Sequence, residues 1–140
     1  MVGIDTLNSL LRGELAATET YQQAMHKAEG SPWDGQLRVI HEDHRKAANR
    51  LRLFVREAGG TPKQDSGVWG TFANFVEGTA RLFGDTAALK ALKEGEESGL
   101  GSYETVVEDD DLPPLFREFL VAQLIPQTRQ HIRTLDQLIA

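Results

Sequence analysis

The chain has 140 residues, of which 40% are hydrophobic and 26% are charged, and this length and balance are typical of one globular domain, here residues 1–140. A formal net charge of −6 argues against a phosphate-binding surface, so nucleic acid is not expected as a partner. The chain has no cysteine, which excludes disulfides, thiolate metal sites and cysteine nucleophiles. Histidines and carboxylates remain as the strong metal ligands, and they favour hard or borderline metals.

The sequence predicts neither a membrane span nor a secretory leader. No apolar run approaches the roughly 20 residues that a membrane-spanning helix needs. The segment 1–9 lacks the basic and apolar regions of a signal peptide. A cytoplasmic location is therefore the default expectation.

Two helices are predicted in the first half of the chain. The first covers about 5–28 and stops at Gly30, a residue with easy access to positive φ. Ser31 as N-cap and Pro32 at the first helical position begin the second helix, which stops at Gly59. Because so few residues join the two helices, they should be antiparallel neighbours.

The pattern changes after the second helix. The segment 59–84 contains a Gly-rich loop and then aromatic and aliphatic residues at helical spacing over 69–83. This pattern predicts a long crossover connection that carries a short amphipathic helix, whose aromatic face caps the bundle. A third helix is predicted over about 86–108. A fourth runs from Pro113 to about residue 139, with a kink at Pro126.

An internal repeat places a carboxylate in two of these helices. LNSLLRGELAATETY (7–21) and LKALKEGEESGLGSY (89–103) share leucines, a Gly-Glu pair and a tyrosine at identical spacing. On a helix, Glu14 and Glu96 lie within the apolar stripe. An unpaired buried carboxylate costs on the order of several kcal/mol, so the matching pair implies a cation, a hydrogen-bond network or raised pKa values. The glycine before each Glu suggests close approach of a neighbouring helix.

The second and fourth helices add histidines in matching positions. LRVIHEDHRKAANRL (37–51) and LIPQTRQHIRTLDQL (124–138) each place a histidine seven residues from a leucine on either side. His44 and His131 therefore lie on the apolar stripes of their helices. His41 lies one turn before the first of them on the same stripe. The resulting order along the chain is carboxylate, histidine, carboxylate, histidine.

The first helix resembles that of ferritin-like proteins, bacterioferritins especially, in which an LN…E pattern is followed by a tyrosine seven residues after a metal-binding Glu. The order of carboxylates and histidines over two helical hairpins also resembles that superfamily. The resemblance implies an all-α, antiparallel four-helix bundle with a carboxylate and histidine metal centre, usually di-iron, in its core. It matches four residues to the metal ligands of the family: Glu14, His44, Glu96 and His131.

The chain departs from the family at the bridging carboxylates. Where the family has Glu three residues before each ligating histidine, this chain has His41 and Thr128. Without bridging carboxylates, two adjacent cations would repel each other. We therefore predict one divalent ion, Fe²⁺, Zn²⁺ or Mn²⁺, rather than two, with His41 as a supplementary ligand. Four carboxylates fall off the apolar stripe and are secondary candidates: Glu19, Glu42, Asp43 and Glu97.

The tyrosines of the repeat are predicted neighbours of the ligands. The resemblance implies that Tyr21 and Tyr103 orient the carboxylate of the opposite repeat. Thr128 is a further predicted neighbour of the ligands. Packing of both rings in the core is the alternative, although a buried Tyr hydroxyl needs a hydrogen-bond partner in either case.

Two functions are compatible with this pattern. The first is a metal-binding ferritin-like protein, in which oxidation of ferrous iron is the activity if iron is the metal. The second is a metal-free helical module, stress-related or partner-binding, whose Glu, His and Tyr side chains form a structural network. A homodimer is compatible with both. An increase in thermal stability on addition of metal would separate the two functions.

Overall fold

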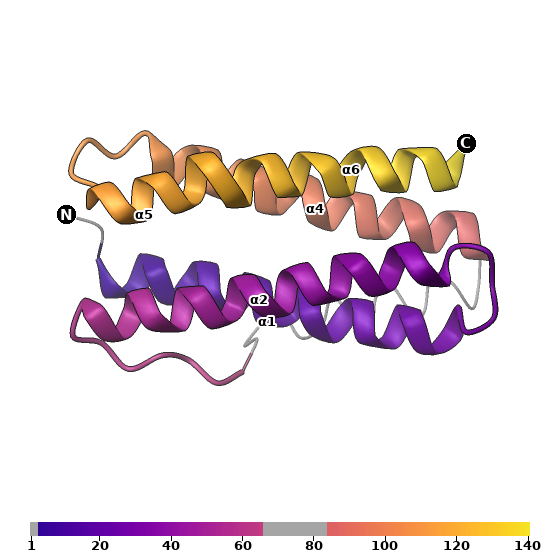
Figure 1. The fold of residues 1–140 in the computed structure, drawn as a ribbon, viewed down its shortest axis with the longest axis horizontal. Coiled ribbons are helices and arrows are strands. Elements are labelled where there is room, and N and C mark those ends of the chain that lie inside the picture. Colours follow the sequence, from indigo (N-terminus) through magenta and orange to yellow (C-terminus); the bar gives the residue numbers. More distant parts are fainter. Residues whose placement is uncertain (1–2, 66–83) are drawn as a thin grey trace.

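A computed structural model describes residues 3–65 and 84–140, and the regular structure in these ranges is helical throughout (Figure 1). The short helix predicted within 69–83 lies outside the described residues. None of the described helices combines the length and the apolar character needed to cross a bilayer. The described ranges form four helical segments: α1 (Ile4–Lys27), α2 (Asp34–Glu57), α4 (Asp85–Val107), and a composite of α5 (Pro114–Phe119), η2 (Leu120–Leu124) and α6 (Ile125–Ile139).

The four segments pair as two hairpins. Figure 1 shows α1 beside α2, joined by a short turn at one end, and α4 beside the segment from α5 to α6, joined at the other end. Most tertiary contacts lie within each hairpin, between α1 and α2 and between α4 and α6. The two hairpins contact each other through α1 and α4 and through α2 and α6.

The interior contains two apolar clusters. Leu51 and Phe116 belong to the first, and Ile40 and Leu135 belong to the second. On each helical segment the buried ionisable residue stands between a member of the first cluster and a member of the second. The buried polar residues in this middle layer are Glu14, His44, Glu96, Thr128 and His131.

The helix ends follow the sequence signals closely, except at the start of α2. Gly30 and Gly59 have φ of +80° and +86° after α1 and α2, as expected for glycine stops. The prediction that Ser31 caps the second helix was wrong, because α2 begins only at Asp34. The N–H of Ser31 donates a 2.8 Å hydrogen bond to the carbonyl oxygen of Ala28, which extends the turn after α1 and delays the next helix.

The fourth segment contains a π-helical turn, Leu120–Leu124, just before Pro126, where a kink was predicted. Proline has no N–H, and its ring clashes with the carbonyl of the residue four positions earlier in a regular α-helix. A π-helical turn is wider than an α-helical turn and accommodates an extra residue there. Regular α-helix continues from Ile125, and it carries His131 into the interior.

Replacing Gly101 in α4 with Ala is expected to raise the free energy of unfolding by about 0.5 to 1 kcal/mol. A Cβ at this position would meet no described atom within 4 Å, so Ala adds helix propensity without a clash. Gly84→Ala is the opposite case, because Gly84 has φ +91°, and it should destabilise the fold. Urea denaturation measures both variants. A destabilised Gly101→Ala protein would contradict this expectation.

Candidate metal centre

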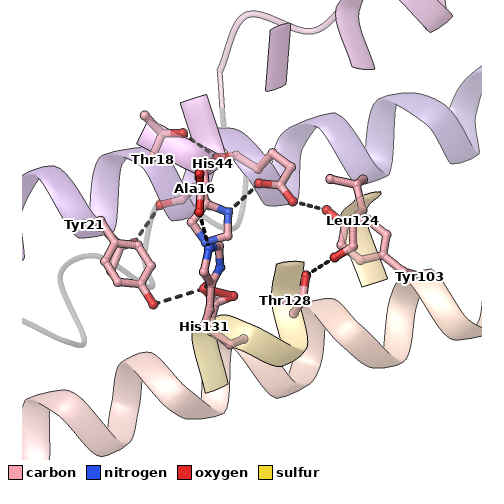
Figure 2. A network of polar contacts seen from close by, with 12 residues as sticks. Ala16, Thr18, Tyr21, His44, Tyr103, Leu124, Thr128 and His131 are labelled. Atoms are coloured by element: carbon pink, nitrogen blue, oxygen red, sulfur yellow. Dashed lines mark hydrogen bonds and ion pairs between the residues drawn. The ribbon is translucent and has the colours of Figure 1, made fainter. Parts of the chain in front are cut away.

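Four buried ionisable side chains meet in the layer between the two apolar clusters, one from each helical segment. Glu14 on α1 and Glu96 on α4 are each 4% exposed. His44 on α2 and His131 on α6 are equally buried. Figure 2 shows the two imidazoles in the middle of the bundle, with the tyrosines of the repeat on either side of them. The four segments therefore bring two carboxylates and two histidines together in one layer.

Both histidines have a carboxylate oxygen beside each ring nitrogen. His44 Nδ1 lies 2.5 Å from Glu14 Oε2, and its Nε2 lies 2.7 Å from Glu96 Oε1. His131 Nδ1 lies 2.9 Å from Glu96 Oε1, and its Nε2 lies 2.8 Å from Asp43 Oδ2. These are hydrogen-bonding distances between imidazole nitrogens and carboxylate oxygens. The metal-free centre is therefore a connected hydrogen-bond network.

Three atoms of this network form a potential metal site. In the described part of the chain, His44, Glu96 and His131 each offer one ligand atom, and these atoms lie within 4.8 Å of one another. Two imidazole nitrogens and one carboxylate oxygen are a donor set that suits Zn²⁺ and non-haem Fe²⁺. The three residues could therefore hold a metal ion. This group includes neither Glu14, which contacts one of its histidines, nor His41, which is partly exposed on α2.

Two residues outside the primary predicted ligand set, Asp43 and Thr128, make different contacts. Asp43, a secondary candidate, accepts a hydrogen bond from His131, and its side chain is 29% exposed. It lies next to His44 in the sequence but faces α6, so the pairing of α2 with α6 was needed to find its role. Thr128 is buried, and its Oγ1 donates a 2.7 Å hydrogen bond to the carbonyl oxygen of Leu124 in the same segment.

The tyrosines link the two hairpins through the carboxylates (Figure 2). The Tyr21 hydroxyl on α1 donates a 3.2 Å hydrogen bond to Glu96 Oε1 on α4. The Tyr103 hydroxyl on α4 donates to Glu14 on α1. Each tyrosine thus contacts the carboxylate of the other repeat. Burial and the adjoining carboxylates raise the pKa of both hydroxyls well above 10.0, so both stay protonated.

The charges of the centre follow from burial and pairing. Burial alone raises the pKa of Glu96, but its contacts with His44 and His131 outweigh burial and lower that pKa from 4.5 to about 2. Burial alone lowers the pKa of His44, but Glu96 and Glu14 raise it well above 6.5. In the metal-free protein at neutral pH, Glu96 is therefore ionised and His44 carries a positive charge.

Comparison with known families gives one match, which covers three of the four helical segments. Residues 3–109 match the family described as Domain of unknown function (DUF2383). This chain belongs to that family. Within it, the matched region contains Glu14, His44 and Glu96, whereas His131 follows the matched region. Neither the curated proteins nor the solved structures gave a match.

In this DUF2383 protein, replacing Tyr103 with Phe is expected to lower the free energy of unfolding by about 1.5 to 3 kcal/mol. The hydroxyl donates to the buried carboxylate of Glu14, and Phe preserves the packing of the ring. Tyr21→Phe is the matched comparison, and it should cost less because Glu96 keeps two histidine contacts. Denaturation curves of both variants provide the measurement. Wild-type stability in Tyr103→Phe would contradict the role of this hydroxyl.

Proposed function

We propose that this protein binds one divalent metal ion through His44, Glu96 and His131. The observation that carries the proposal is the convergence of three ligand atoms from three buried side chains on three helices. Ionisable side chains are rarely buried in a core without a role, because removing them from water is costly. Fe²⁺, Zn²⁺ and Mn²⁺ are the ions that this donor set suits.

The contacts outside this group support the proposal. Glu14 accepts a hydrogen bond from the Nδ1 of His44, whose Nε2 faces Glu96. Asp43 likewise accepts a hydrogen bond from the Nε2 of His131, whose Nδ1 faces Glu96. In metal sites, a carboxylate at the far nitrogen of a ligating imidazole fixes its tautomer and orientation. We therefore assign this orienting role to Glu14, in place of the ligand role inferred from the resemblance.

We place the chain in the ferritin-like superfamily, with one domain folded as an antiparallel four-helix bundle. Three observations support this assignment: the pairing of segments into two hairpins, the long connection between α2 and α4, and the reciprocal tyrosine and carboxylate contacts. One ion is proposed rather than two because Thr128 and the partly exposed His41 supply no bridging carboxylate.

A bound divalent ion would supply Lewis-acid chemistry, and iron would add one-electron chemistry, with ferrous oxidation as the expected activity. The chain's own residues have separate tasks in this proposal. His44, Glu96 and His131 bind the ion, and Glu14 and Asp43 orient the imidazoles. The two apolar clusters flank the layer on either side.

A metal-free structural network is the second candidate function. The observation that favours it is that all four nitrogens of His44 and His131 already face carboxylate oxygens at hydrogen-bonding distance. A fully paired buried network can specify one packing of a core without catalysis. In this function, the bundle would act through its surface, as a stress-related or partner-binding module.

Thermal unfolding of the metal-stripped chain separates the two functions. At a free metal concentration about a hundredfold above Kd, binding stabilises the folded state by about 2.7 kcal/mol, which corresponds to a rise in Tm of roughly 5 to 10 °C. We expect this rise with at least one of Fe²⁺ (kept anaerobic), Zn²⁺ and Mn²⁺. His131→Ala should abolish it, and His26→Ala, an exposed histidine of α1, should not. An unchanged Tm with all three ions would favour the structural network.

A ferroxidase activity has its own test. After anaerobic loading with Fe²⁺, air is admitted and ferric absorbance is followed. We expect oxidation faster in the wild-type chain than in His131→Ala and in buffer. Equal rates in all three samples would reject this activity while leaving metal binding intact.

A further inference from the structure

A cavity of about 750 Å³ lies between α1 and α4, directly beside the candidate metal centre. Glu14, His44 and Glu96 form part of its wall, together with both tyrosines of the repeat. This volume falls within the range of pockets that bind small molecules, roughly 300 to 1,000 Å³. A cavity large enough for a small-molecule ligand therefore borders the buried polar layer.

Small residues on both helices create this space. Gly13 and Ala17 on α1 and Gly95 and Gly99 on α4 line the cavity. Close approach of a neighbouring helix was predicted at Gly13, but that prediction was wrong, because a Cβ there would meet no described atom within 4 Å. The same holds at Gly99. Gly13, next to Glu14, thus borders open volume instead of a close helix contact.

The lining indicates which molecules the cavity accepts. Its described lining contains no Lys or Arg, and its carboxylates belong to Glu14, Glu94 and Glu96. Both ring nitrogens of His44 already face two of these carboxylates at hydrogen-bonding distance. An anion would therefore meet repulsion without a free cation to offset it. The remaining described wall consists of glycines, alanines and aliphatic side chains such as Leu10, with uncharged serine and threonine side chains among them, so an uncharged, mainly apolar molecule fits best.

We propose that this cavity binds an uncharged, mainly apolar organic molecule, one end of which lies against Glu14, His44 and Glu96. Its role as a substrate site beside a metal ion rests on the proposed function. Binding of the molecule itself requires only the cavity and is open to test in the metal-free chain.

A pair of fluorescent probes tests the proposed class of ligand. Anilinonaphthalene is uncharged and apolar, and its sulfonate has the same rings with a negative charge. Each is titrated into the full-length, metal-stripped chain, and the rise in fluorescence is followed. We expect one site per chain for the uncharged probe, with an affinity at least about tenfold higher than that of the sulfonate. Equal affinity for both probes, or no binding of the uncharged one, would overturn the proposal.

Variants locate the probe. Gly13→Leu and Gly99→Leu each add a side chain toward the cavity, and each should weaken binding of anilinonaphthalene at least about tenfold. Gly35→Leu on α2 is the matched control, since a Cβ there also meets no described atom within 4 Å and Gly35 does not line the cavity. Circular dichroism identifies any variant that fails to fold. If one cavity variant does not fold, probe binding by the other cavity variant tests the location. Unweakened binding in a folded cavity variant, or an equal loss in the control, would contradict this location.

The probe experiment can fail or succeed independently of the experiment that tests metal binding. A chain whose Tm rises with Zn²⁺ but which does not bind anilinonaphthalene has the metal site without the ligand site. A chain that binds the probe without any response to metal has the cavity site alone, and then the role as a substrate site beside a metal is rejected.

Discussion

Replacing Glu96 with Gln is expected to lower the free energy of unfolding of the metal-free chain by about 3 to 5 kcal/mol and to abolish metal binding. Glu96 Oε1 lies 2.7 Å from His44 Nε2 and 2.9 Å from His131 Nδ1. It also accepts the hydrogen bond of Tyr21. Loss of the carboxylate charge leaves the positive charge of His44 poorly compensated in a site shielded from water. Urea denaturation at about pH 7 measures the change.

The control for this variant lies at the next position of α4. Glu97 is exposed, and Glu97→Gln should change the free energy of unfolding by less than about 0.5 kcal/mol and leave metal binding intact. If Glu96→Gln were as stable as Glu97→Gln, then Glu96 would not be an ionised partner of the histidines. Calorimetric titration of both variants with Zn²⁺ then tests the ligand role separately from stability.

Below the raised pKa of His44, the apparent affinity for Zn²⁺ should increase about tenfold for each unit by which the pH is raised. Coordination by its Nε2 requires release of the proton that Glu96 and Glu14 hold on the ring, and these carboxylates raise that pKa well above 6.5. Glu96 itself stays ionised down to about pH 2, so it adds no competing proton in this range. Calorimetry in buffers of different ionisation enthalpy counts the protons released. An affinity independent of pH would contradict coordination through His44.

The folding stability of the metal-free chain should depend on pH differently from the affinity for Zn²⁺. The stability contributed by His44 is fully present below its ordinary pKa of 6.5 and is lost as the pH rises through its raised folded-state pKa. The stability contributed by Glu96 is present above 4.5 and is lost as the pH falls toward about 2. These two groups therefore favour maximal stability between about pH 4.5 and 6.5. Metal binding should move the optimum to higher pH.

The helices were predictable because their signals are local. Apolar residues at three- and four-residue steps mark the buried face, and Gly30 and Gly59 mark the ends. The start of α2 was misplaced because Ser31 carries the usual capping signal but bonds instead to the turn after α1. Pro126 indicated a disturbed helix, yet the local pattern did not distinguish a kink from a π-helical turn.

The burial of Glu14, His44, Glu96 and His131 in one layer was predictable, whereas the contacts that each side chain makes there were not. The stripe pattern places Glu14, His44, Glu96 and His131 at one level, because the repeat sets both the face and the height of each side chain. It does not state which residue of a neighbouring helix each atom meets. Asp43 therefore ranked low, although it contacts His131. The assignment of Glu14 as an orienting carboxylate depends on distances that periodicity does not contain.

Anomalous scattering from crystals of the metal-stripped chain soaked with Co²⁺ tests the central claim most directly. We predict one peak per chain, within coordination distance of His44 Nε2, Glu96 Oε1 and His131 Nδ1. No peak among these three atoms, or a second ion beside the first, would contradict a single-ion centre in the core.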